Sequence, residues 1–177
     1  MSEWTPMAKW STDIACRQAM RADSEKLVQI YNDYVVNSTA TFALNPETTA
    51  ERESWLDLHA SLRYPVEIVT IDGVVEGFAS LSPYHARCAY ALTAEVSIYL
   101  SPQARGHRLG DALLGKLHDH ADKMGLHTLL ALVCSENKPS IALFERNGYE
   151  LSGTLRQVGK KFDRYLDVAI YQWIKSK

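Results

Sequence analysis

The chain has 177 residues, of which 46% are hydrophobic and 23% charged, and its formal net charge is −2. This length suits one globular domain rather than two, and the near-neutral charge argues against a general role on nucleic acid or on a membrane surface. Because no apolar run approaches the roughly 20 residues of a membrane helix and the N-terminus lacks the apolar core of a signal peptide, we expect a cytoplasmic protein.

The first half of the chain predicts an N-terminal extension and two helices. Residues 1–14 have no clear period, so we expect either a loosely ordered extension or a segment that docks onto a neighbouring subunit, and residues 15–177 form a single domain. Asp23 is positioned to cap a helix whose apolar residues share one face: Leu27, Ile30, Tyr31 and Tyr34. Thr48 and Glu51 have the spacing of a capping box for a second helix. The inward residues of that helix are expected to be Trp55, Leu58 and Leu62.

Strands are predicted next. The Asp-Gly turn at residues 72–73 indicates a hairpin that joins strands over residues 66–71 and 74–81. A long strand over residues 89–100 carries Glu95, because apolar and polar residues alternate there.

A helix and a buried strand follow. The helix has its apolar positions at Leu109, Leu113, Leu117 and Met124 and ends at Gly125. The apolar run at residues 128–134 predicts a strand parallel to the strand at 89–100. The whole chain then has the order β-α-α-β-β-β-α-β-α-β-β, an α+β arrangement around a mixed sheet.

The segment SPQARGHRLGDALL, residues 101–114, connects that strand to that helix. The first N–H groups of a helix have no partners within it, so small residues there let an anion such as pyrophosphate approach the backbone. Gly106 and Gly110 supply small residues, and Arg105 adds a charge. The alternative is a plain turn in which the glycines set the chain direction and Arg105 is solvated.

A later motif, Asn-x-x-Ser-Ile-x-Leu-x-Glu-x-x-Gly-Tyr at residues 137–149, completes a recognisable order. Together with the Arg-Gly loop that opens a helix, it resembles the acetyl-CoA fold of the GNAT superfamily of N-acetyltransferases. Further segments resemble the phosphinothricin and methionine sulfone acetyltransferase branch, which acetylates the amino group of small amino-acid analogues. These segments are residues 31–32, 38–42, 51–55, 87–95 and 158–167.

The resemblance implies an α+β, GNAT-like fold, in which a central mixed, strongly twisted β-sheet is flanked by α-helices on both faces. It implies acetyl-CoA as co-substrate, a small-molecule amine as acceptor, and a homodimer. The implied cofactor-binding residues are Ile98, Tyr99, Leu100, Arg105, Gly106, His107, Arg108, Leu109, Gly110, Asp111, Asn137, Ser140, Phe144 and Arg146. The implied substrate-binding residues are Phe42, His85, Arg87, Tyr90 and Glu95.

Glu95 is the candidate catalytic residue. An α-amine with a pKa of about 8 to 9 is mostly protonated at neutral pH, so a carboxylate within reach, directly or through one water, lowers the barrier to attack on a thioester. Glu95 lies on the strand that leads into the glycine-containing loop. The alternative is an exposed strand carboxylate without a role.

Other candidate residues also have more than one interpretation. Arg87 either holds the acidic group of the substrate with its guanidinium fork or is a solvated loop residue. Asn137 binds the cofactor, caps the next helix, or does both. Phe42 and Tyr90 either form walls of the substrate pocket or belong to the core. The C-terminal segment with Lys161, Phe162, Arg164 and Tyr165 lines either the substrate site or a dimer interface.

Four positions depart from the pattern of the branch. Arg108 stands where the loop usually has glycine, His85 where an arginine is usual, and Ala94 where a valine is usual. Phe144 replaces the histidine or tyrosine that is proposed to protonate the departing thiolate, and phenylalanine cannot donate that proton. Since water can protonate a thiolate of pKa about 8.5, we expect slower transfer rather than none.

Cysteines and histidines lack the spacing of a metal site. Cys16, Cys88 and Cys134 are odd in number and widely separated, which favours unpaired thiols. His118 and His120 are two residues apart on a predicted helix, so their side chains diverge. We therefore expect no bound metal.

Three functional hypotheses remain from the sequence. The first is an acetyl-CoA-dependent N-acetyltransferase of phosphinothricin, methionine sulfone or methionine sulfoximine type analogues, which transfers the acetyl group directly with Glu95 as general base. The second has the same fold and acetylates a protein or peptide. The third is a CoA-binding module with little turnover, suggested by Arg108 and Phe144. Glu95, Arg87 and the C-terminal segment favour the first.

Overall fold

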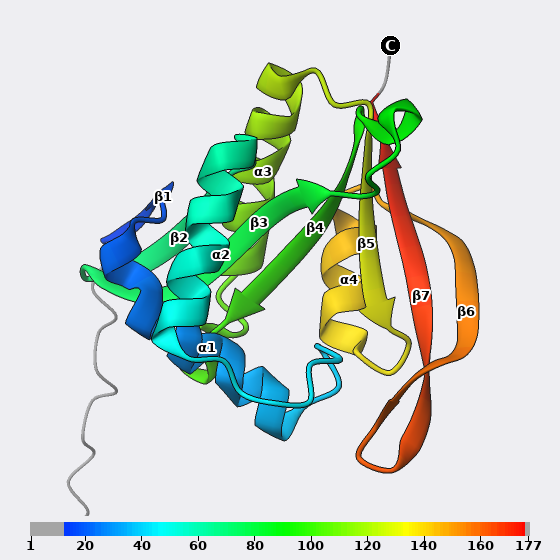
Figure 1. The fold of residues 1–177 in the computed structure, drawn as a ribbon, viewed down its shortest axis with the longest axis horizontal. Helices are drawn as coiled ribbons and strands as arrows, with labels where there is room; N and C mark the ends of the chain where they lie inside the picture. Colours follow the sequence, from blue (N-terminus) through cyan, green and yellow to red (C-terminus); the bar gives the residue numbers. More distant parts are fainter. Residues whose placement is uncertain (1–12, 176–177) are drawn as a thin grey trace, which may run out of the picture.

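In the computed structural model, of which residues 13–175 are described, seven strands form one mixed, twisted sheet (Figure 1). The strand order across the sheet is β1-β2-β3-β4-β5-β7-β6. Their bounds are Ile14–Gln18, Val66–Ile71, Val74–Pro83, Thr93–Leu100, Thr128–Cys134, Glu150–Lys161 and Arg164–Ile174 for β1 to β7. The predicted extension of residues 1–14 lies almost entirely outside the described residues.

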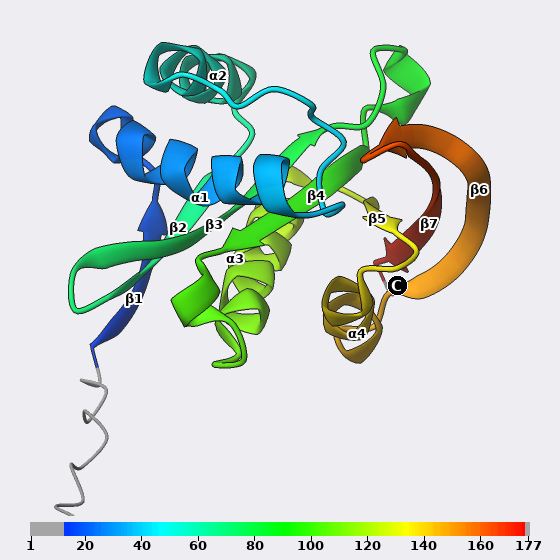
Figure 2. The same ribbon diagram turned by 90° about the horizontal axis from the view of Figure 1, so that it is seen from below.

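Four helices cover the two faces of the sheet. They are α1 (Ser24–Asn37), α2 (Thr49–Leu62), α3 (Leu109–Met124) and α4 (Lys138–Arg146). Helices α1 and α2 lie on one face, whereas α3 and α4 lie on the other (Figure 2). The order of strands and helices is the predicted one, and the expected α+β architecture is confirmed. None of the helices in residues 13–175 is long and apolar enough to cross a membrane.

The pairing of β4 with β5 is the parallel step of the sheet, as predicted, and the other neighbours in the strand order pair antiparallel. The predicted hairpin joins β2 and β3. The predicted start of the next strand at residue 89 is wrong, because residues 88–90 form a short 3-10 helix, η2, and β4 begins only at Thr93. The apolar pattern at Ala89 and Tyr90 belongs to an exposed loop, where alternation does not indicate pairing.

Each face of the sheet has its own hydrophobic cluster. On the α1 and α2 face, Leu27 and Ile30 pack against strand residues Ile68 and Phe78. On the other face, the α3 leucines that define the predicted apolar stripe are fully or almost fully buried: Leu109, Leu113 and Leu117. The sequence therefore identified the buried faces of α1 and α3 correctly.

The inward face of α2 differs from the prediction. Leu58 and Leu62 are 54% and 48% exposed, whereas Arg52 and His59 are buried together with Leu56. The helix is rotated in this way because the Arg52 guanidinium lies over the rings of Tyr31, Trp55 and Phe78, at 4.6, 4.6 and 5.3 Å from their centroids. A buried arginine cannot be anticipated from an apolar periodicity.

The two predicted helix caps have different outcomes. At α2, the Thr48 hydroxyl accepts from the Glu51 amide at 3.2 Å and the Glu51 carboxylate accepts from the Thr48 amide at 2.7 Å, so the capping box is confirmed. At α1, Asp23 makes no side-chain cap. A short 3-10 helix, η1 (Arg21–Asp23), precedes α1, and the Asp23 carboxylate instead accepts from Arg17 and from the Met20 amide.

Candidate active site

The sheet opens where β4 and β5 part. Their ladder joins only Thr93–Glu95 to Thr128–Leu130, and beyond Glu95 the two strands diverge (Figure 1). Residues 96–100 of β4 and residues 132–133 of β5 border a cavity of about 810 Å³. This opening gives a ligand access to backbone groups in the middle of the sheet.

The cavity collects the predicted cofactor residues from four separate segments: β4, the loop before α3, the first turn of α3, and α4. All the predicted cofactor residues except His107 and Asp111 line it. Ser38, Thr39 and Ala40, which follow α1, also line it. The structure thus brings together residues that are up to about 110 positions apart in the sequence, a condition for a common binding site.

Only some of the β4 backbone faces this opening. Alternate residues of a strand direct their N–H and C=O groups to opposite edges, and the Ser101 amide donates to Glu76 on the β3 side. Ile98 and Leu100 therefore face β5, whereas Tyr99 faces β3. The Tyr34 hydroxyl donates to the Leu100 carbonyl at 2.7 Å and accepts from its amide at 3.2 Å. Ile98 is thus the residue of the predicted three whose backbone is directed into the opening and is not held by Tyr34.

The loop before α3 has two backbone features that favour an approaching anion. Gly106 has φ +84°, a conformation that favours glycine, and the N–H groups of Leu109 and Gly110 have no acceptor within the helix. The Asp111 amide, in contrast, donates to the Arg108 carbonyl at 3.1 Å. A Cβ on Gly110 would lie 3.1 Å from Leu143, so this glycine also allows close packing of α3 on α4.

Cationic side chains surround the loop, and two of them are paired. Arg105 lies 3.3 Å from the Asp33 carboxylate and over the Tyr34 ring. Arg146 holds Asp111 with two hydrogen bonds of 2.7 and 2.8 Å, and these hydrogen bonds lower the pKa of the Asp111 carboxyl. Asp111 therefore acts as the anchor of Arg146, which lines the cavity, rather than as a lining residue.

On α4, Asn137 and Phe144 have structural contacts as well as places in the cavity wall. The Asn137 side chain caps α4 by accepting from the Ser140 amide at 3.3 Å. Phe144 is 4% exposed and packs edge-on against Tyr149, with 5.1 Å between the ring centroids. Both residues border the cavity.

Arg108 has a left-handed backbone, with φ 58° and ψ 18°, at the position where the family resemblance expects glycine. This conformation costs an L-residue about 1 to 2 kcal/mol. We therefore expect Arg108→Gly to raise the free energy of unfolding by up to about 1 kcal/mol, measured by urea denaturation, because part of the gain is lost to the flexibility of glycine in the unfolded chain.

Arg63, which ends α2 with φ 60°, provides the matched control. Arg63→Gly relieves the same type of strain away from the cavity, so it should stabilise the protein similarly and leave unchanged the Kd for acetyl-CoA, the co-substrate that the family resemblance implies. Arg108→Gly also removes a cation from the cavity and should raise that Kd. A destabilised Arg108→Gly variant would contradict the claim that the left-handed backbone of Arg108 is strained.

Glu95 is the last residue of β4 that pairs with β5, so its position coincides with the start of the opening. It is half-buried, and burial raises the pKa of its carboxyl above the ordinary value. A carboxylate with a raised pKa is a stronger base. The exposed-carboxylate alternative for Glu95 therefore does not describe its environment.

Apart from Glu95, which also does not line the 810 Å³ cavity, the predicted substrate residues fall into two groups. His85, Arg87 and Tyr90 lie together in the exposed loop between β3 and β4, where the Arg87 amide donates to His85 Nδ1 at 3.1 Å and the His85 and Tyr90 rings are 5.2 Å apart. This loop leaves β3 and re-enters β4 beside Glu95, because Ser82 is the register partner of Glu95. Phe42 lies apart from them, in the segment after α1. Neither group lines the 810 Å³ cavity.

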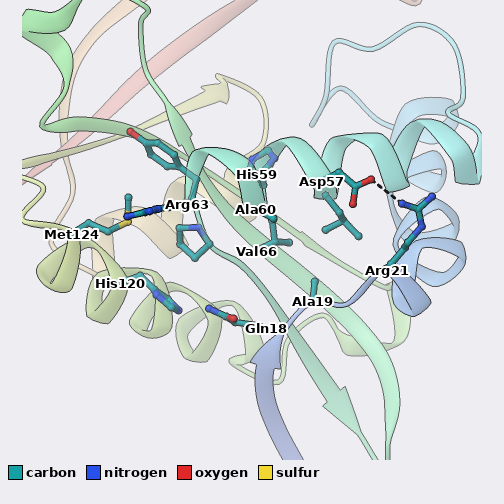
Figure 3. A pocket seen from close by; sticks show the side chains of 13 residues that line it. Gln18, Ala19, Arg21, Asp57, His59, Ala60, Arg63, Val66, His120 and Met124 are labelled. Carbon is teal, nitrogen blue, oxygen red and sulfur yellow. Dashed lines mark hydrogen bonds and ion pairs between the residues drawn. The ribbon is translucent and has the colours of Figure 1, made fainter.

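A second cavity of about 460 Å³ lies between α2, the start of β2 and α3 (Figure 3). None of the predicted site residues lines it, and two of its charged side chains bind other side chains. Arg21 pairs with Asp57 at 2.8 Å, and His120 Nε2 lies 2.7 Å from the Glu67 carboxylate. The opening between β4 and β5 is therefore the candidate site.

Tyr34 and Glu136 are among the residues of the cavity wall that the sequence did not assign to the site. Tyr34 was predicted only as part of an apolar helix face, yet its hydroxyl forms hydrogen bonds with both the carbonyl and the amide of Leu100. Glu136 also lines the cavity and accepts hydrogen bonds from Thr39 and Arg164. No local pattern marks either role, because the partners are far away in the sequence.

In residues 13–175, no group of three or more His, Cys, Asp or Glu side chains could hold a metal ion. Cys16, Cys88 and Cys134 are free thiols.

The mixed sheet, with a glycine-containing loop before α3 at its opening, agrees with the resemblance to the class of N-acetyltransferases that use acetyl-CoA. The family model of the acetyltransferase (GNAT) family matches residues 26–149. The chain therefore belongs to the GNAT acetyltransferase family, and the predicted fold and resemblance are confirmed.

Relatives of known activity cover nearly the whole chain. It is 38% identical over 157 residues to the L-methionine sulfoximine/L-methionine sulfone acetyltransferase of Pseudomonas aeruginosa, covering 88% of this chain and 91% of that protein. It is 34% identical over 165 residues to the phosphinothricin N-acetyltransferase of Streptomyces coelicolor, covering 92% and 96%. A GNAT superfamily phosphinothricin acetyltransferase of Sinorhizobium meliloti, solved in complex with acetyl-CoA, has a TM-score of 0.88 at 34% identity and covers 91% of this chain and 88% of that chain.

Proposed function

We propose that residues 15–177 act as a single N-acetyltransferase domain, which transfers the acetyl group of acetyl-CoA directly to the amino group of a small amino-acid analogue. The acceptor class is phosphinothricin, methionine sulfone or methionine sulfoximine. The observation that carries the proposal is the opening between β4 and β5, which begins at Glu95 and ends at the loop before α3. The named activities of the relatives support the acceptor class.

The cavity wall suits the chemistry of CoA. The N–H groups at the start of α3, with Arg105, Arg108 and Arg146 around them, would hold the pyrophosphate. The Ile98 backbone faces the opening and would hydrogen-bond the pantetheine arm or the thioester carbonyl, as an added strand does at a sheet edge. Acetyl-CoA supplies the thioester that the amine attacks.

Glu95 is the proposed general base. Its carboxylate would accept a proton from the acceptor ammonium, directly or through one water, so that the neutral nitrogen bonds to the acetyl carbon while the bond from that carbon to sulfur breaks. The raised pKa of the Glu95 carboxyl supports this role. Phe144 offers no proton to the departing thiolate, so solvent would supply that proton and would take the second proton that the nitrogen releases when the amide forms.

Arg87 is the proposed anchor of the acidic group of the acceptor, with His85, Tyr90 and Phe42 as further contacts. The support is the place of the loop: Pro83, which precedes it, pairs with Ala94, directly before Glu95. A free amino acid held by its carboxylate would thus be near the proposed base. A peptide acceptor lacks that carboxylate next to its amine.

We further propose a cytoplasmic homodimer. The three free thiols support a reducing compartment. Exposed apolar side chains on the β6 and β7 hairpin support association between copies: Leu151, Leu155, Val158, Phe162 and Tyr165. Light scattering on the purified protein should give twice the monomer mass, and a monomer mass would refute the dimer.

The proposed function is tested by incubating the protein with acetyl-CoA and methionine sulfone, methionine sulfoximine, phosphinothricin or unmodified amino acids while thiol release is followed. N-terminal peptides in the same assay test acetylation of proteins. Isothermal titration with CoA separately tests a binding module without turnover.

A further inference from the structure

Two segments singled out by the sequence, residues 38–42 and 158–167, contact each other in the folded protein. Segment 38–42 follows α1, and residues 158–165 form the end of the β6 and β7 hairpin. Lys161 donates to the Thr41 carbonyl at 2.8 Å and lies 3.5 Å from the Tyr34 carbonyl. These contacts join residues about 120 positions apart in the chain.

Gly159 gives Phe42 its place. A Cβ built on Gly159 would lie 2.2 and 2.3 Å from two carbons of the Phe42 ring, far inside van der Waals contact. The ring therefore rests directly on the β6 backbone, and every side chain larger than hydrogen at residue 159 would displace it.

Lys161 is an unusual cation for a hairpin. It is 4% exposed, and burial lowers the pKa of its ammonium group. Within residues 13–175, backbone carbonyls rather than a carboxylate receive its hydrogen bonds. The neighbouring Lys160 is 55% exposed and pairs with Asp163. Burial of the Lys161 ammonium group costs desolvation energy, and its hydrogen bonds to the backbone offset part of that cost. The same hydrogen bonds fix the position of segment 38–42.

A third contact holds the start of the segment. Thr39 donates to the Glu136 carboxylate at 2.9 Å, and Arg164 holds the same carboxylate with hydrogen bonds of 2.8 and 3.1 Å. Glu136 and Thr39 both line the cavity between β4 and β5. The hairpin is thus connected through Glu136 to the wall of the candidate active site.

The other end of the connection between α1 and α2 is fixed separately. Asn32 donates to the Glu47 carbonyl at 2.9 Å and accepts from its amide at 2.8 Å. The contacts with Gly159, Lys161 and Glu136 therefore determine only the half of the connection that lies at the cavity.

We infer that the end of the β6 and β7 hairpin is a seat for segment 38–42, in which Gly159, Lys161 and Arg164 are positioning residues. The seat holds Phe42 where the amine acceptor packs against it, and holds residues 38–40 against the cavity. It acts on the acceptor side of the reaction. This inference rests on the proposed acetyltransferase function and gives the C-terminal segment a role in acceptor binding.

The test uses Lys161→Met, which keeps the length of the side chain and removes its donors, with Lys160→Met as the matched control. Hydrogen exchange of residues 38–47 measures the seating without any activity. Steady-state kinetics with methionine sulfone and titration with acetyl-CoA measure its consequence. For Lys161→Met we expect faster exchange, a KM for the amine raised about tenfold or more, and a Kd for acetyl-CoA within about threefold of wild type. Lys160→Met should behave as wild type.

Gly159→Ala tests the same seat from the other side and keeps the buried cation, should Lys161→Met fail to fold. Its matched control is Gly153→Ala on the same strand, where a Cβ would meet nothing within 4 Å. Unchanged exchange of residues 38–47 in the folded variants would overturn the seat, and faster exchange with an unchanged KM would overturn its role in acceptor binding. If the wild type acetylates no amine although exchange responds as expected, the proposed function fails and the seat stands without an acceptor role.

Discussion

Glu95→Gln should reduce turnover at pH 7 by about 10² to 10⁴ while the Kd for acetyl-CoA remains nearly unchanged, because glutamine keeps the shape and cannot accept the proton. The pH profile carries more information than the loss itself. The wild-type kcat/KM should rise with pH through the raised pKa of the Glu95 carboxyl. The deficit of the variant should shrink at high pH, where the amine is already neutral.

Stability gives an internal check on this variant. Because the Glu95 pKa is raised in the folded state, the folded protein binds its proton more tightly, so the contribution of this group to stability is lost as pH rises through the raised pKa. Glu95→Gln should therefore be at least as stable as wild type at pH 7, and reduced activity would not come from unfolding. Glu25→Gln, an exposed residue in the first turn of α1, is the control. Wild-type turnover in Glu95→Gln at pH 7 would refute the role of Glu95 as general base.

Arg87→Ala should lower kcat/KM for methionine sulfone, mainly through a higher KM, because one charge-assisted contact to the acceptor carboxylate is lost. The decrease should correspond to a loss of about 2 to 4 kcal/mol in transition-state stabilisation. Acceptors whose carboxylate is amidated should be poor substrates of the wild type and should lose little more in the variant. Steady-state kinetics with matched acid and amide pairs measure both effects.

Arg156→Ala removes another exposed arginine, on β6, and should leave these parameters unchanged. If amides and peptides react as well as free acids and Arg87→Ala has no effect, Arg87 is not the anchor. The alternative of a protein or peptide acceptor would then gain support.

The features of this protein that depend on local sequence could be predicted. The apolar stripe of α3 is read from positions three and four apart, the hairpin between β2 and β3 from an Asp-Gly turn, and the α2 capping box from Thr48 and Glu51. Most of the residues predicted to bind the cofactor line the cavity between β4 and β5, and the loop before α3 and the start of α4 carry local motifs.

Features that depend on distant contacts were missed. Residue 52 would be expected on the surface by its charge, yet three aromatic rings bury Arg52 and rotate α2 accordingly. Tyr34 reaches Leu100 across 66 residues of sequence, and Thr39 reaches Glu136 across 97. The contact between the end of the β6 and β7 hairpin and segment 38–42 likewise follows from tertiary packing and not from any periodicity.

The measurement that tests the central proposal most directly is thiol release from acetyl-CoA in the presence of methionine sulfone, with the acetylated product identified by mass spectrometry. We expect saturable, amine-dependent release and a product heavier than methionine sulfone by one acetyl group, carried on its amino nitrogen. Tight binding of acetyl-CoA with no amine-dependent release from any acceptor in the panel would contradict the account.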